Sequence, residues 1–200
     1  MRPTQHGTLG TTLLWRESPS STEHVSPAME IHLMKVLVAV ASKHGATLEI
    51  GQVIEASIHS SGLDVELKRV EDISSLSAFD AFVIGSGVYA GHWMRSAREF
   101  IEIHEGELRQ KPVWLFSSGP VGDPPKPLEN PAEVAGVVKK LGSRGHRLFP
   151  GRIEGSDLGI SEKALVALVR APDGDYRPWS EIATWAESIA AQLQADPTEA

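Results

Sequence analysis

The sequence predicts an α/β fold: a doubly wound, five-stranded parallel sheet in the order 2-1-3-4-5, with helices on both faces. Apolar runs of strand length alternate with helical stretches of about ten to sixteen residues, and such crossovers produce parallel strands covered on both sides. The run at residues 63–70 alternates apolar and polar residues, which suits an edge strand. Three loops rich in glycine and serine fall at the carboxyl end of such a sheet, where ligands bind.

The first strand and the first helix have the clearest signals. Residues 35–41 (KVLVAVA) are mostly small or branched and apolar, as in a strand buried on both faces. Residues 46–61 carry apolar side chains at helical spacing, and Gly62 is suited to end that helix.

The remaining elements follow the same alternation. Residues 79–85 (FDAFVIG) and 112–117 (PVWLFS) predict the next buried strands, with a helix over about 94–108 between them. The last part predicts, in order, a helix at 133–141, a weaker strand at 146–153 interrupted by Pro150, a helix at 161–170 and a helix at 179–193. The tryptophans expected in the core are Trp114, Trp179 and Trp185.

Composition limits the class of protein. Two hundred residues suit one domain, and a net charge of −7 argues against nucleic acid as the main partner. The chain has no cysteine, and its eight histidines show no metal-ligand spacing, so we expect no metal site. There is no apolar run of membrane-spanning length and no secretory signal, which makes the cytoplasm the expected location. We expect residues 1–33 to be a disordered extension, 34–194 the folded domain and 195–200 a tail.

The segment after the first strand, residues 42–47 (SKHGAT), predicts a phosphate-binding loop. A helix N-terminus offers unpaired N–H groups and partial positive charge, Gly45 allows close approach, and two hydroxyls and a lysine can add contacts. The alternative is a polar turn in which Ser42 or Thr47 only caps the helix.

Two later loops, residues 86–93 (SGVYAGHW) and 117–122 (SSGPVG), occupy matching topological positions and favour the ligand-binding interpretation. A dinucleotide fingerprint and a nucleoside triphosphatase loop are both absent. A phospho-receiver domain needs acidic residues where this chain has Lys43, His44 and Ser86. A mononucleotide with one phosphate and a planar ring remains, and FMN fits best.

With these motifs the chain resembles the flavodoxin-like superfamily, and within it the branch of menaquinone-dependent protoporphyrinogen oxidases and their actinobacterial-type relatives. The resemblance is carried by residues 41–47, 83–93, 114–127 and 171–179 and extends over about residues 34–193. The oxidase pattern has an Arg-Tyr pair where this chain has Tyr89-Ala90, and its longer segment before the last helix is reduced here to residues 171–179. Both differences bear on the substrate more than on the flavin.

The resemblance implies how the loops would hold FMN. The phosphate would be bound by Ser42, Lys43, His44, Gly45, Ala46 and Thr47. One side of the isoalloxazine would meet Ser86, Gly87, Val88, Tyr89, Ala90, Gly91 and Trp93, and the other Ser117, Ser118, Gly119, Pro120, Val121 and Gly122. Tyr89 is the first choice to stack on the ring, whereas Trp93 could stack or pack in the core. His92 is the candidate catalytic residue, able to bond the ring or protonate substrate, with a solvent-facing loop histidine as the alternative.

The expected function is an FMN-dependent oxidoreductase, with porphyrinogen dehydrogenation and a quinone acceptor, as in heme biosynthesis, the named candidate. A flavodoxin-type electron carrier with a protein partner and no substrate of its own is the alternative, and a partner-binding module without cofactor is a third. The basic residues Lys139, Lys140, Arg144, His146, Arg147 and Arg152 could contact an acidic partner, a porphyrin carboxylate or a membrane surface, or could be a solvated helix end.

Overall fold

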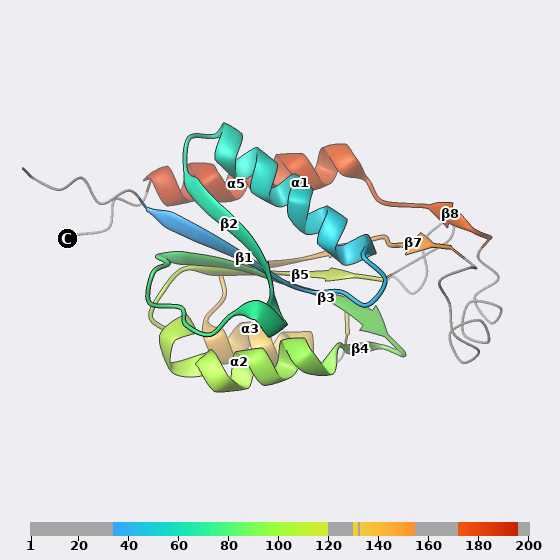
Figure 1. Ribbon diagram of the computed structural model, residues 1–200, viewed down its shortest axis with the longest axis horizontal. Helices are drawn as coiled ribbons and strands as arrows, with labels where there is room; N and C mark the ends of the chain where they lie inside the picture. Colours follow the sequence, from blue (N-terminus) through green and yellow to red (C-terminus); the bar gives the residue numbers. More distant parts are fainter. Residues whose placement is uncertain (1–33, 120–129, 132, 155–171, 196–200) are drawn as a thin grey trace, which may run out of the picture. The chain divides into compact units, whose positions relative to one another are not determined.

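A computed structural model of the chain describes residues 34–119, 130–131, 133–154 and 172–195 (Figure 1). Its central sheet has the strand order β2-β1-β3-β5-β6, and all four pairings along this path are parallel. The strands are β1 (Lys35–Ala41), β2 (Asp64–Arg69), β3 (Ala81–Tyr89), β5 (Val113–Ser118) and β6 (Gly145–Phe149). A short strand, β4 (His92–Trp93), pairs antiparallel with β3 outside this path. The predicted fold class and strand order are confirmed.

Helices cover both faces of the sheet (Figure 1). One face carries α1 (Ala46–Ser60) and α5 (Trp179–Ala195), and the other carries α2 (Arg95–Leu108) and α3 (Val134–Leu141). A single 3-10 turn, η1 (Val70–Asp72), follows β2. Among the described residues, no helix combines the length and the apolar character needed to cross a bilayer.

Strand β1 shows why the core has two layers. Val36, Val38 and Val40 pack with residues of α1 and α5, whereas Leu37 and Ala39 pack with residues of α2 and α3. This alternation is the period-two pattern of a strand, and all five side chains are fully buried. Burying a valine or leucine side chain contributes about 1.5–3 kcal/mol, so β1 anchors both layers.

One glycine in β3 is required by packing. A Cβ on Gly85 would lie 2.0 Å from the Cζ atom of Phe116 in the neighbouring strand. The Phe116 ring therefore occupies the space above Gly85, and it packs edge-on against Trp185 with ring centroids 6.2 Å apart. The apolar run of this strand therefore ends in glycine, because a side chain at position 85 would clash with the Phe116 ring.

Of two sequence expectations about the C-terminal part, one holds only in part and the other was wrong. Residues 146–153 do not form one strand: β6 ends at Phe149, and β7 (Arg152–Ile153) pairs with β8 (Gly174–Asp175) in a separate ribbon. Pro150 lies between them, and a proline lacks the N–H that a continuing ladder needs. Trp179 is not a core residue, because it is 38% exposed, whereas Trp114 and Trp185 are buried as expected.

Several predicted segments lie outside the described residues. These are the extension at 1–33, the helix at 161–170, the end of the third loop at 120–122 and the tail beyond residue 195. The other predicted helices and strands are present, with bounds that differ by a few residues at most apart from β3, which continues to Tyr89.

Candidate functional site

The loop between β1 and α1 contains two buried hydroxyl-bearing residues. Ser42 and Thr47 are 5% and 4% exposed. Gly45, the residue before the helix, has φ 87°, a left-handed conformation that favours glycine. No side-chain hydrogen bond caps α1. The predicted alternative, in which Ser42 or Thr47 only caps the helix, is therefore not observed among the described residues.

The hydroxyl of Ser42 is the most informative atom in this loop. Its Oγ is buried without a hydrogen-bond partner, a condition that it shares among the described residues only with Ser96 in α2. A buried polar group left unpaired costs about 1–3 kcal/mol, and such groups in native proteins are usually satisfied by water or a ligand. A phosphate oxygen beside the helix N-terminus would accept this bond, so the loop fits a phosphate monoester.

Two arginines hold the carbonyl groups of the same loop. The Arg69 Nη1 atom donates to the Ser42 carbonyl and the Arg177 Nη1 atom to the Ala46 carbonyl, each at 3.0 Å. In a trans peptide the N–H points opposite to the C=O. The amide groups of Lys43 and Thr47 are therefore turned away from the guanidinium groups. Amide donors that the fold leaves in this orientation are available to an anion.

Arg177 belongs to a compact charged network next to α1. Its guanidinium binds Asp175 through two contacts of 2.7 Å and contacts Glu49 at 2.9 Å, while Arg152 contacts Glu49 at 3.0 Å. The Arg177 side chain is only 2% exposed and stacks on the Trp179 ring, 4.2 Å from its centroid. Burial opposes its charge, but hydrogen bonds with Asp175 and Glu49 outweigh burial and raise the pKa of Arg177. The network ties residues 174–179 to the predicted phosphate loop.

The second predicted loop contacts the first through Tyr89. The Lys43 Nζ atom lies 5.7 Å from the centroid of the Tyr89 ring, and the His44 ring meets that ring edge-on at 6.3 Å. A Cβ on Gly87 would lie 3.0 Å from Tyr89 Cε2 and 3.2 Å from Thr47 Oγ1. Gly87 therefore allows the tyrosine to lie close to the phosphate loop.

The third segment reaches the same place from β5. A Cβ on Gly119 would lie 2.8 Å from the Cβ of Val88, and the Gly119 N–H donates to the Phe149 carbonyl at 3.3 Å. The predicted convergence of three segments at the carboxyl end of the sheet is confirmed for their described parts. Pro120, Val121 and Gly122 lie outside the described residues.

The segment at residues 86–93 is a hairpin rather than a loop. Ser86 to Tyr89 extend β3, and the register pairs Val88 with Trp93 and Tyr89 with His92. The residues between, Ala90 and Gly91, have φ angles of 50° and 81°, as in a type I′ turn. The sequence contained this signal, because a glycine in a two-residue turn between alternating side chains is typical of a hairpin.

Buried hydrogen bonds fix the base of this hairpin. Ser86 Oγ accepts from the Met94 N–H at 2.9 Å, and the Trp93 Nε1–H donates to Ser117 Oγ at 2.7 Å. Ser117 Oγ lies 2.8 Å from Nε2 of His146. Burial lowers the pKa of His146 to about 4, so its ring is neutral near pH 7. Trp93 is 2% exposed, which favours the core interpretation of this residue over stacking on a ligand.

A carboxylate holds the tip of the hairpin. Glu133, which precedes α3, accepts from the Trp93 N–H through Oε1 and contacts Nδ1 of His92 through Oε2, both at 2.6 Å. Burial would raise the pKa of Glu133, but the bonds from His92 and Trp93 lower it, so the group is ionised near neutral pH. Nothing in the sequence spacing pairs Glu133 with His92, which lies 41 residues away.

Three residues of the predicted basic cluster contact other groups of the fold. Lys140 contacts Glu105 at 2.8 Å, and Arg152 contacts Glu49. Arg144 lies over the Trp114 ring at 5.4 Å. These charges are therefore largely engaged by the fold itself.

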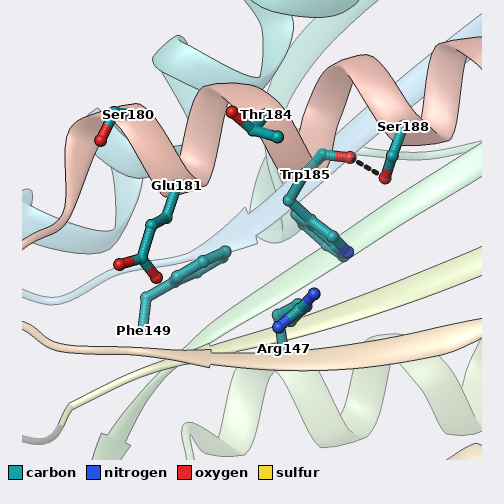
Figure 2. A pocket seen from close by; sticks show the side chains of 7 residues that line it. All are labelled: Arg147, Phe149, Ser180, Glu181, Thr184, Trp185 and Ser188. Carbon is teal, nitrogen blue, oxygen red and sulfur yellow. Dashed lines mark hydrogen bonds between the residues drawn. The ribbon is translucent and has the colours of Figure 1, made fainter.

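A groove lies elsewhere, between β6 and α5 (Figure 2). It encloses about 320 Å³ and is lined by Arg147, Phe149, Ser180, Glu181, Thr184, Trp185 and Ser188. Figure 2 shows the Arg147 and Trp185 side chains pointing toward each other across it. None of the predicted cofactor residues lines this groove, so the candidate site is the carboxyl end of the sheet.

Comparison with known proteins agrees with this geometry. A sequence model of the flavodoxin domain matches residues 37–178. The chain belongs to the flavodoxin-domain family. This flavodoxin domain is 25% identical over 182 residues to protoporphyrinogen IX dehydrogenase [quinone] of Escherichia coli O6:H1, covering 82% of this chain and 99% of the relative. The protein of the same description from Escherichia coli O157:H7 matches equally.

Solved flavodoxins share the fold of this flavodoxin domain. An archaeal flavodoxin superimposes with a TM-score of 0.58 at 18% identity, covering 80% of this chain and 99% of that one. The two-electron reduced flavodoxin of Megasphaera elsdenii gives a TM-score of 0.53 at 19% identity, covering 78% and 98%. At these identities the likeness concerns the fold alone.

Proposed function

We propose that this protein binds FMN and acts as an oxidoreductase that dehydrogenates a porphyrinogen-type substrate and passes the electrons to a quinone. The observation that carries the FMN assignment is the unpartnered, buried Ser42 hydroxyl in a loop whose Ser42 and Ala46 carbonyls are held by two arginines. Membership in the flavodoxin-domain family supports the cofactor. Similarity to protoporphyrinogen IX dehydrogenase [quinone] supports the substrate and acceptor.

Each part of the site has a task in this proposal. The loop at residues 42–47 holds the phosphate through backbone N–H groups, the hydroxyls of Ser42 and Thr47, and the charge of Lys43. The segments ending in Tyr89 and Gly119 bound the flat ring system. When bound, FMN supplies the electron-transfer chemistry, and the protein orients it and sets its surroundings.

A flavodoxin-type electron carrier is the second candidate. It is supported by the fold that the chain shares with an archaeal flavodoxin and with the flavodoxin of Megasphaera elsdenii. Anaerobic assays with protoporphyrinogen IX and menadione separate the two. Turnover by the FMN-loaded protein supports the oxidoreductase, whereas a loaded protein that only exchanges electrons with other redox proteins is a carrier.

The phosphate assignment is tested with Ser42→Ala and the matched control Ser96→Ala. Both remove a buried hydroxyl without a partner, so both are expected to stabilise the FMN-free protein by up to about 1–2 kcal/mol in urea unfolding. Only Ser42→Ala should weaken FMN binding, by about tenfold or more, because a bond to a charged group contributes about 1.5–3 kcal/mol.

Flavin fluorescence titration measures the FMN affinity, and mass spectrometry identifies the flavin that copurifies with the protein. Equal FMN affinity in wild type, Ser42→Ala and Ser96→Ala would reject Ser42 as a phosphate ligand. A protein that takes up no FMN at all would reject the proposed function.

A further inference from the structure

The carboxylate of Glu133 and the ring of His92 form a close pair at the tip of the β3–β4 hairpin. The Glu133 side chain is 22% exposed and that of His92 is 60% exposed. Both oxygens of Glu133 are engaged, one by Nδ1 of His92 and one by the Trp93 N–H, each at 2.6 Å. The carboxylate is therefore held from the backbone of the same hairpin whose histidine it contacts.

This contact fixes the chemical state of the His92 ring. A carboxylate can only accept, so Nδ1 of His92 carries the hydrogen, and Nε2 is left for another partner. A protonated His92 held in this way presents an Nε2–H donor from a largely exposed ring.

The position of the pair relates it to the candidate flavin site. Tyr89 and His92 are directly opposite in the hairpin, a relation that places two side chains on the same face. Tyr89 in turn meets Lys43 and His44 of the predicted phosphate loop. Of the other charged groups, Arg98 on α2 acts on Glu133 and lowers its pKa slightly further.

We propose that His92 is the proton donor to a quinone reduced at the flavin, and that Glu133 is its positioning residue. This inference rests on the proposed function, which supplies both the reduced cofactor and the quinone. A quinone becomes a hydroquinone by taking up two electrons and two protons. FMN, when bound and reduced, would supply one hydrogen together with both electrons as a hydride. The role of His92 would be to pass the second proton from its Nε2 atom to a quinone oxygen. The neutral imidazole that remains is reprotonated by water.

The first test measures the tautomer of His92 by ¹⁵N NMR in the full-length protein. We expect neutral His92 to carry its hydrogen on Nδ1 in wild type and on Nε2 in Glu133→Gln. The glutamine oxygen can keep the Trp93 bond, and the NH2 group then faces Nδ1 of His92 as a donor, so that Nδ1 must accept. The matched control is Glu102→Gln at a solvent-exposed position on α2, which should leave the tautomer unchanged. The same tautomer in wild type and Glu133→Gln would overturn the positioning role.

The second test follows reoxidation of the FMN-loaded, dithionite-reduced protein by stopped flow. With menadione, His92→Gln and Glu133→Gln should be slower than wild type by about tenfold or more. With ferricyanide, which accepts single electrons and no proton, all variants should react at the wild-type rate. A purely structural role of the pair would slow both reactions or neither.

The outcomes separate this inference from the function on which it rests. Loaded variants that reoxidise with menadione at the wild-type rate would overturn proton donation by His92 and leave the FMN assignment standing. A chain that takes up no FMN would overturn both.

Discussion

Replacing His146 with glutamine is expected to remove part of the pH dependence of stability. Burial lowers the pKa of this histidine to about 4, from an ordinary value of 6.5. Between these two values the unfolded chain binds a proton that the native protein excludes, so the contribution of His146 to stability falls as the pH falls from 6.5 toward 4. Above pH 6.5 the contribution is fully present, because the ring is neutral in both states.

The size of the effect follows from the depth of the pKa change. The full difference between the native and the ordinary pKa of His146 corresponds to a change of about 3 kcal/mol at most in the free energy of unfolding. The side chain is only partly buried, and screening by solvent reduces this figure to about 1–2 kcal/mol. A glutamine can still accept the Ser117 hydrogen bond without titrating, so stability near pH 7 should change little.

Urea unfolding at pH 7.5 and at pH 4.5 measures this effect. Between pH 7.5 and pH 4.5, the free energy of unfolding should fall by about 1–2 kcal/mol more in wild type than in His146→Gln, since only wild type carries the titrating ring. The control is His59→Gln on the exposed end of α1, which should keep the wild-type dependence. Parallel pH profiles for wild type and His146→Gln would refute the assignment of a buried neutral ring.

Three further substitutions test other parts of the structure. Gly85→Ala should destabilise the protein by about 1–3 kcal/mol in urea unfolding, because the new Cβ meets the Phe116 ring; an unchanged midpoint would contradict the close approach. Arg177→Lys should cost about 1–3 kcal/mol and weaken FMN binding, since lysine cannot reproduce the two parallel bonds to Asp175; full stability with full affinity would remove its supporting role. Tyr89→Ala should shift the flavin midpoint potential or lower FMN affinity, and an identical redox titration would assign stacking elsewhere.

The framework of the fold was predictable because its signals are local. Residues 35–41 are apolar at every position but the first, and a strand buried on both faces requires that composition. The half-polar pattern of β2 placed it at an edge, where the structure has it. Given these two assignments and the right-handed crossover rule, the sheet order and the meeting of the loops followed.

Two failures had different physical causes. The hairpin at residues 86–93 was missed although its turn was visible in Ala90-Gly91, because the glycines were assigned to a ligand loop. Trp179 was expected in the core together with Trp114 and Trp185, yet its ring lies over the guanidinium of Arg177. Aromatic rings serve apolar cores and cationic partners equally well, and helical spacing alone does not distinguish the two.

The polar residues that hold the loops of the site could not be identified from the sequence, because their partners depend on the topology of the fold. Arg177 binds the carbonyl of a residue 131 positions earlier, and Glu133 binds a histidine 41 positions earlier. The sequence does not show which residue a charged side chain will contact, because the folded sheet decides which distant elements become neighbours. In this fold Glu133, His146 and Arg177, which hold parts of the predicted ligand loops, all come later in the chain than those loops. The candidate site therefore depends on residues that are distant from it in sequence. Among them, Arg177 holds the Ala46 carbonyl of the phosphate loop, so its substitution should weaken FMN binding although its side chain does not contact FMN.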